Sequence, residues 1–266
     1  MHKITGNSLL NLVPLLDNEP LDYPITKGVL DGTFSGYAIV DDPKYPTKAM
    51  IFHTHIGFAH YLGSCPCENE IAECTESVIK YRSDRKYCNW IEIAHCPNPV
   101  IDLVTEKIPE MKKYNRISWN HDVSLWKNTP FPSIPDGCKI MLLNNTHFKN
   151  TFVRHETEMF WDSTDVFLEK AIGTIALDKR GKFMGVCAAV SDSDDFYEIN
   201  IEVSKKHRRK GIGYAVAHRY ITECYKRNKK PHWDCFEHNN ASRSLASKLG
   251  FVESGRYPLV SWTYQI

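Results

Sequence analysis

The chain has 266 residues, of which 42% are hydrophobic and 24% charged, a balance typical of a folded globular protein rather than a disordered or collagen-like one. Lysine and arginine number 33 and aspartate and glutamate 32, so the net charge of +1 argues against a nucleic acid or an anionic membrane as partner. Any site for an anion must therefore be local.

Membrane insertion and secretion are both disfavoured by the pattern of the chain. No run approaches the roughly 20 continuous apolar residues of a membrane helix, and the apolar run at 9–16 is broken by Asn11 and Pro14. Nine cysteines in a chain of this length are too sparse for a disulfide scaffold. We therefore expect reduced thiols and a cytoplasmic protein.

The first half mixes the signals of strands and helices. Apolar runs at 37–40 and 49–52 lie between turn signals, and helix-compatible stretches follow at 68–81 and 100–113. This order predicts an α/β or α+β domain.

A proline-rich stretch separates the two halves. Pro130, Pro132 and Pro135 favour an extended connector, because proline fixes φ and donates no backbone hydrogen bond. We place the boundary near residue 136, which gives domains of residues 1–136 and 137–266.

The second half has a clearer periodicity. One strand alternates an apolar and a polar face, and the helix after it carries an apolar residue at every fourth position. The polar face of the strand consists of Glu198, Asn200 and Glu202. In chain order the pattern predicts a helix (156–170), a two-stranded hairpin (172–178 and 183–191), a strand (197–204), a helix (211–227), a strand (231–236), a helix (239–249) and two final strands separated by Gly255.

Residues 208–213, Arg-Arg-Lys-Gly-Ile-Gly, lie between that strand and that helix. The two glycines allow a tight curl, so that backbone N–H groups converge at the positive end of the helix dipole. Val216 stands where a dinucleotide fingerprint needs a third small residue, and Lys210 precedes the glycine that it follows in nucleoside-triphosphatases. We interpret the segment as a pyrophosphate cradle; the alternative is a solvated basic turn.

Two motifs together suggest a family. The Arg-x-x-Gly-x-Gly turn is followed, after a helix and a strand, by Asn239-x-x-Ser242-x-x-Leu245-Ala246-x-Lys248-Leu249-Gly250-Phe251. This arrangement resembles the GNAT superfamily of N-acetyltransferases. The resemblance implies a C-terminal GNAT fold, a mixed and mostly antiparallel sheet flanked by helices, preceded by an α/β domain that a degenerate GNAT-like fold would also fit.

The resemblance also implies acetyl-coenzyme A (acetyl-CoA) and the residues that bind it. The strand before the turn is expected to splay at a bulge near Val203 and to pair its backbone with the pantetheine arm. Asn239 is expected to reach the coenzyme near the start of the following helix; the alternative role is a helix cap, and the two roles are not exclusive. The implied cofactor-binding residues are Val203, Ser204, Arg208, Arg209, Lys210, Gly211, Ile212, Gly213 and Asn239.

Acyl transfer to an amine needs a base, an oxyanion donor and an acid. Glu198 is the candidate base with Glu202 in reserve, unless both are exposed carboxylates paired with surface cations. A backbone N–H near Val203 is the implied oxyanion donor. Many GNAT enzymes carry a tyrosine acid where this chain has Ala246, so Tyr257, Tyr214 or water would have to replace it.

Other polar clusters are assigned no role. One Cys-x-Cys without a matching pair is weak support for a metal, so none is expected. Three charged residues in the segment 155–158 are interpreted as surface groups. The residues concerned are His53, His55, His60, Cys65, Cys67 and Cys74 for the metal, and His155, Glu156 and Glu158 for the surface.

Three functions stay open. The first is an acetyl-CoA-dependent N-acetyltransferase that acts on a primary amine of a small molecule, without a nucleic-acid or membrane partner. The second is a CoA-binding regulatory or pseudo-enzymatic module without efficient turnover, suggested by Ala246. The third is a nucleic-acid or ribosome binder that uses the basic run 205–210, against which the net charge argues.

Overall fold

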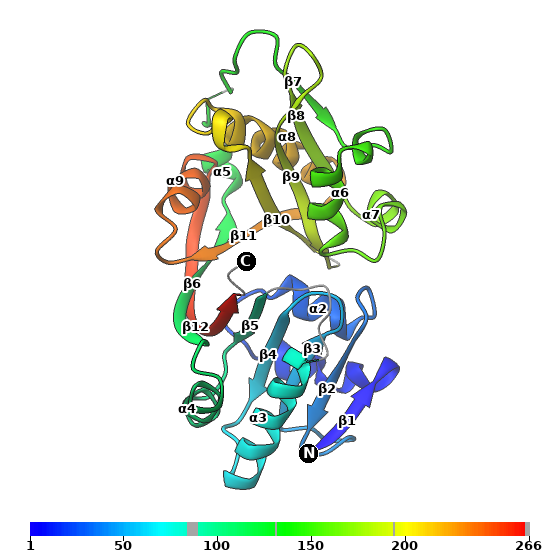
Figure 1. Ribbon diagram of the computed structural model, residues 1–266, viewed down its shortest axis with the longest axis vertical. Helices are drawn as coiled ribbons and strands as arrows, with labels where there is room; N and C mark the ends of the chain where they lie inside the picture. Colours follow the sequence, from blue (N-terminus) through cyan, green and yellow to red (C-terminus); the bar gives the residue numbers. More distant parts are fainter. Residues whose placement is uncertain (84–89, 131, 194, 264–266) are drawn as a thin grey trace. The chain divides into compact units, whose positions relative to one another are not determined.

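The computed structural model describes residues 1–83, 90–130, 132–193 and 195–263 (Figure 1). The chain divides into two compact units: Met1–Arg116 with Arg256–Ile266, and Ile117–Gly255. Among the described residues, no helix has the length and apolar character needed to cross a membrane.

Unit 1 is an α/β unit built on one sheet. Its elements are β1 (His2–Thr5), η1 (Gly6–Leu12), α1 (Val13–Asp17), α2 (Pro24–Leu30), β2 (Gly36–Val40), β3 (Lys48–His53), β4 (Phe58–Gly63), α3 (Glu68–Ser83), β5 (Trp90–Ala94), α4 (Asn98–Lys107) and the end of β12 (Phe251–Thr263). The strand order is β1-β2-β3-β4-β5-β12, and β4 and β5 are parallel. Helices α3 and α4 contribute Val78 and Val104 to a buried core that β5 lines with Ile91 and Ile93.

Unit 2 is also an α/β unit. Its elements are the end of β6 (Lys112–His121), α5 (Val123–Trp126), β7 (Lys139–Leu142), η2 (His147–Lys149), α6 (Thr151–Glu158), α7 (Thr164–Lys170), β8 (Gly173–Leu177), β9 (Phe183–Asp192), β10 (Phe196–Val203), η3 (Lys205–His207), α8 (Ile212–Lys226), β11 (Lys230–Phe236), α9 (Asn240–Lys248) and the start of β12. The order is β12-β6-β11-β10-β9-β8-β7, with β10 and β11 parallel.

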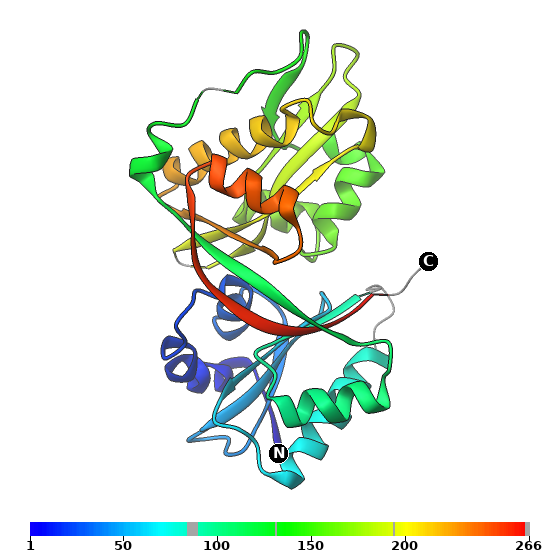
Figure 2. The ribbon, with the colours of Figure 1, turned by 90° about the vertical axis from the view of Figure 1, so that its left-hand side faces the viewer.

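The two units repeat one chain order. In each, an antiparallel pair (β3–β4 or β9–β10) is followed by a helix, a strand parallel to the second member, and another helix. The strand after that helix then passes into the other unit, as Figure 2 shows for β6 and β12.

Helix α8 forms where the apolar stripe predicts it. Ile212, Val216, Tyr220 and Cys224, four residues apart, are all fully or almost fully buried. At roughly 25 cal/mol per Å² of apolar surface, each such side chain contributes about 1.5–3 kcal/mol on burial. Packing of this stripe therefore fixes the start of the helix beside the basic turn.

The helix predicted over 156–170 is two helices. Between them Trp161 is buried and its indole Nε1 donates to the carbonyl of Ala189, 2.8 Å away. Ser163 then caps α7 by accepting from the N–H of Val166. The chain bends here because burying the indole and starting a capped helix both require it.

Other boundaries also differ from those predicted. The helix predicted over 100–113 ends at Lys107 and β6 begins at Lys112, and the two strands predicted around Gly255 are one strand, β12. The division between the units falls within β6, whereas the boundary expected near residue 136 lies inside unit 2. The prolines mark a loop that approaches α8, where Tyr214 Oη donates to the carbonyl of Pro130 at 2.7 Å.

Candidate functional site

A groove of about 1030 Å³ opens in unit 2 around the basic turn. It is bounded by the end of β10, the start of α8, β11 and α9. The residues that line it are Ile201, Glu202, Val203, Lys205, Arg208, Arg209, Gly211, Ile212, Gly213, Tyr214, Trp233, Asn239, Ala241, Ser242, Ser244, Leu245 and Lys248.

The groove lies where β10 and β11 part. The two strands pair only from Phe196–Lys230 to Glu198–His232, although β10 continues to Val203. The N–H of Ser204 donates to the carbonyl of Met184 in β9, at 3.0 Å. Because bonding direction alternates along an antiparallel strand, the N–H and C=O groups of Val203 and Ile201 face the open side.

The start of α8 forms one end of the groove. Gly211 has a φ of 78° and Arg209 one of 59°, left-handed conformations that turn the chain sharply. The N-cap residue of this 15-residue helix is Gly211, which has no side chain that could accept from the first N–H groups of the helix. With Arg208, Arg209, Lys205 and Lys248 in the lining, this end of the groove suits an anion.

Three of the residues predicted to bind the cofactor, Asn239, Ser204 and Lys210, differ in their position relative to the groove. Asn239 lines the groove and also caps α9, accepting from the N–H of Ser242 at 3.1 Å. Ser204 and Lys210 are outside the lining. The Oγ of Ser204 is buried and has no hydrogen-bond partner in the described part of the chain.

The two candidate bases have different surroundings. Glu202 lines the groove with a side chain 43% exposed, and burial raises its pKa although Arg208 lies 4.0 Å away. Glu198 is only 9% exposed and forms the last pair of the β10–β11 ladder with His232. The structure thus places Glu202 in the wall of the groove and Glu198 where the strands begin to part.

A third carboxylate, Glu156 of α6, was interpreted from the sequence as a surface charge. Its Oε2 accepts from Asn200 Nδ2 at 3.2 Å. Burial, and next the charge of Glu202, raise its pKa. Sequence spacing carries no signal for this contact, because it joins a helix to a strand far away along the chain.

The irregularity of β10 is not where the family pattern predicts it. The register against β9 shifts between Glu198 and Ile199, not near Val203. An N–H group freed by a bulge would therefore belong to the middle of the strand. The edge of β10 at Val203 already has contacts within the chain, because the Val203 carbonyl accepts from Arg208 Nε at 3.1 Å and the backbone of Val203 is hydrogen-bonded to the Glu202 carboxylate.

The candidate acids differ as well. Tyr214 lines the groove, with its hydroxyl donating to Pro130. Tyr257 belongs to unit 1, where its ring stacks on His95 with the centroids 4.9 Å apart. Ala246 is fully buried.

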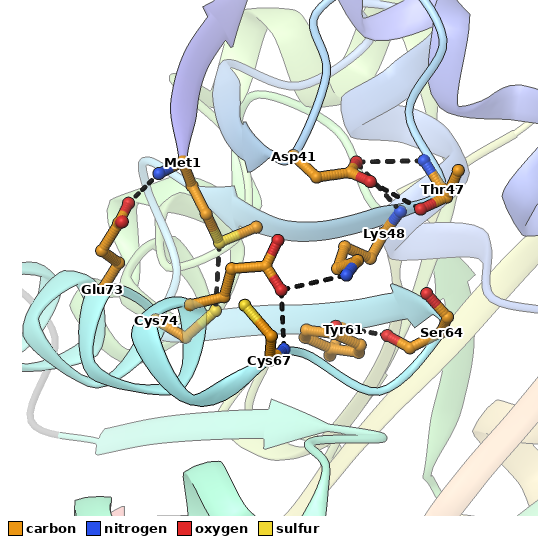
Figure 3. A network of polar contacts seen from close by, with 10 residues as sticks. Met1, Asp41, Thr47, Lys48, Tyr61, Ser64, Cys67, Glu73 and Cys74 are labelled. Atoms are coloured by element: carbon orange, nitrogen blue, oxygen red, sulfur yellow. Dashed lines mark hydrogen bonds and ion pairs between the residues drawn. The ribbon is translucent and has the colours of Figure 1, made fainter.

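In unit 1 the helix equivalent to α8 begins differently (Figure 3). Near the start of α3, Glu70 Oε2 accepts from the N–H of Cys67 at 2.7 Å and pairs with Lys48 Nζ at 2.9 Å. The chain's own carboxylate therefore lies where unit 2 leaves its helix N-terminus uncapped.

Two of the histidines considered as metal ligands, His53 and His60, make hydrogen bonds within unit 1. His53 Nδ1 accepts from the N–H of Ile56 at 3.2 Å, and His60 Nδ1 lies 2.8 Å from Thr26 Oγ1. Within the described ranges, no three His, Cys, Asp or Glu side chains are grouped as a metal would require.

A family model and a curated relative each match most of the chain. The family model described as "GNAT acetyltransferase" matches residues 14–260. "Uncharacterized N-acetyltransferase YdfB" of Bacillus subtilis is 24% identical over 238 residues, covering 87% of each chain.

Two solved structures are similar in fold. A GCN5-related N-acetyltransferase-like protein from Streptococcus suis matches with a TM-score of 0.75 and 19% identity, covering 97% of this chain and 100% of the other. A GCN5-related N-acetyltransferase from Sphaerobacter thermophilus matches with a TM-score of 0.66 and 12% identity, covering 100% and 96%.

Proposed function

We propose, from the premise that this chain belongs to the GNAT acetyltransferase family, that it transfers the acetyl group of acetyl-CoA to a primary amine of a small molecule. The thioester supplies an activated acyl group. The observation that carries the proposal is the groove between the parted strands, which ends at the uncapped start of α8.

The groove fits the coenzyme part by part. The N–H groups at the start of α8 would hold the pyrophosphate, with Arg208 and Arg209 adding charge-assisted hydrogen bonds. The edge of β10 at Val203 would pair with the amides of the pantetheine arm once Arg208, whose Nε donates to the Val203 carbonyl at 3.1 Å, turns to the pyrophosphate. Asn239 keeps its role as a cap and can present its amide nitrogen to the coenzyme.

The chemistry then depends on positioning and on one base. Holding the thioester and the amine at short range removes much of the entropic cost of the encounter. Glu198 takes the proton of the amine, and Glu202, whose raised pKa reflects partial burial, is the alternative base. Glu198→Gln and Glu202→Gln distinguish the two: the variant that loses turnover while it keeps CoA affinity identifies the base.

We do not expect unit 1 to bind a coenzyme. Glu70 and Lys48 satisfy each other near the start of α3, where a pyrophosphate would meet a carboxylate. We infer that unit 1 is a degenerate second copy of the GNAT fold, consistent with its repeated chain order.

Calorimetry with CoA and acetyl-CoA, followed by thiol release with a panel of amines, tests the proposal. We expect binding with both and turnover with at least one amine. Ligand at a hundredfold its Kd stabilises the folded state by about 2.7 kcal/mol, which a thermal shift detects. Absence of CoA binding would refute the assignment.

A coenzyme A-binding module without efficient turnover is the second candidate. It is favoured by Ala246 at the usual tyrosine position and by the hydrogen bond of Tyr214 to Pro130. Tight binding without thiol release from any amine of the panel would select this candidate.

A further inference from the structure

A row of polar side chains crosses unit 2 on one face of four neighbouring strands, β12, β6, β11 and β10. Ser254 Oγ donates to Ser118 Oγ at 3.1 Å, and Ser118 Oγ lies 3.0 Å from His232 Nε2. His232 is in turn the ladder partner of Glu198, so the two side chains project from the same face of the sheet. The second ring nitrogen of His232, Nδ1, is buried and makes no hydrogen bond within the described part of the chain, so neighbouring positions in the sheet, and not a hydrogen bond, join His232 to Glu198.

The row leads from the interior to the surface. Ser118, His232 and Glu198 are 0%, 2% and 9% exposed, whereas Ser254 is exposed. Buried polar groups of this kind are costly unless they are hydrogen-bonded, so an apolar row would be the simpler solution for packing alone. A function would explain why a polar row is present.

The inner end of the row lies where the chemistry is proposed. Glu198–His232 is the last pair of the ladder before β10 and β11 part. On the other side of Glu198, its β9 partner Ser191 is fully buried, and its Oγ has no hydrogen-bond partner among the described residues. Glu198 therefore has buried polar neighbours on both flanking strands.

We propose that His232 and Ser118 relay a proton between Glu198 and the surface at Ser254, a proposal that rests on the function proposed above. Imidazole accepts a proton on one nitrogen while releasing one from the other, and a serine hydroxyl both donates and accepts. Each hydroxyl can rotate, so the chain can be oriented either way.

The proton balance of the reaction gives the relay its task. An ammonium acceptor carries one proton more than the reactive amine, and Glu198 removes it before attack. The N–C bond then forms and the C–S bond breaks, and the second proton of the nitrogen goes to the departing sulfur. The first proton passes from Glu198 through His232 and Ser118 to Ser254 and water, which returns Glu198 to its basic form.

Ser118→Ala and His232→Gln interrupt the relay and leave the groove intact. We expect kcat to fall about tenfold or more, with KM for the amine and Kd for CoA unchanged. Ser118→Thr keeps a hydroxyl and should restore kcat. Thr174→Val is the matched control: it removes an equally buried hydroxyl, bonded to the carbonyl of Val216 at 2.8 Å, and should lower stability without changing kcat.

A second measurement needs no turnover. The relay provides a route by which the ring proton of His232 exchanges with water, so NMR should show slower exchange in Ser118→Ala. If the bond were only structural, its removal would loosen the site and speed exchange.

The outcomes separate the two proposals. Unchanged kcat in both relay variants, or faster exchange in Ser118→Ala, overturns the relay while the acetyltransferase proposal stands. Failure of the unaltered protein to bind CoA overturns the acetyltransferase proposal instead, and the relay with it, because the relay then has no reaction to serve.

Discussion

Substitution of Gly213, in the first turn of α8, tests whether glycine is needed there for the fold or for binding of the ligand. A Cβ there would lie 3.4 Å from Val203 Cγ2 and 3.5 Å from Leu245 Cδ2, which are ordinary contacts. Alanine in a helix is favoured over glycine by about 0.5–1 kcal/mol. Gly213→Ala should therefore keep or raise stability, by about 2–4 °C per kcal/mol for a unit of this size.

Binding should move in the opposite direction. If the diphosphate approaches the backbone at the start of α8, the added methyl group occupies part of its space. We expect Gly213→Ala to weaken CoA at least tenfold, about 1.4 kcal/mol or more, in calorimetry. Undiminished CoA affinity in a stably folded Gly213→Ala would refute the backbone cradle.

Gly211 and Gly181 serve as a matched pair for the comparison. Both have a positive φ, 78° and 75°, so alanine at either costs about 1–2 kcal/mol. A Cβ at Gly211 would also lie 2.8 Å from the carbonyl oxygen of Ser133, whereas Gly181 has open space. Urea unfolding should show the larger loss for Gly211→Ala; equal losses would mean that the proline-rich loop is not held there.

Three further predictions concern stability and binding. His121 donates its Nε2 proton to the carbonyl of Leu249 and accepts from Tyr225 at 2.6 Å, and burial lowers its pKa to about 4. Because the folded state binds fewer protons between about 6.5 and 4, stability should fall as pH is lowered through this range, by about 3 kcal/mol in urea titrations, and His121→Gln should flatten the dependence. Asn239→Ala should cost about 1 kcal/mol through loss of the α9 cap, whereas Asn239→Ser should restore stability but not CoA affinity; recovery of both in calorimetry would leave only the capping role. Trp161→Phe should lower stability by about 1–3 kcal/mol, since it leaves the Ala189 carbonyl without the indole donor, and unchanged unfolding would show that water replaces it.

Local periodicity predicted helix α8 and the turn before it, but it did not predict the break between α6 and α7 or the continuity of β12. The stripe from Ile212 to Cys224 located α8, and two glycines beside three cations located the turn. The family resemblance is confirmed by the match over residues 14–260. These features depend on residues that are near one another along the chain.

The contacts that the sequence could not predict depend on the order of the strands in the sheet. Ser118, His232 and Ser254 lie on three strands that are far apart in sequence, and only their adjacency in the sheet joins them. The contact of Glu156 with Asn200 has the same character. The boundary predicted near residue 136 rested on the proline-rich stretch, which lies inside unit 2. Proline favours an extended loop within a unit as well as between units.

The exchange of β6 and β12 has a consequence for biosynthesis. The segment of β12 that pairs with β5 follows the whole of unit 2 in the sequence, so the sheet of unit 1 lacks one strand until unit 2 has been synthesised. Conversely, a fragment cut at residue 136 would present β11 with its β6 neighbour missing. The two halves of this gene product are thus obliged to mature together, and fusion or splitting of one half alone would leave an exposed strand edge prone to aggregation.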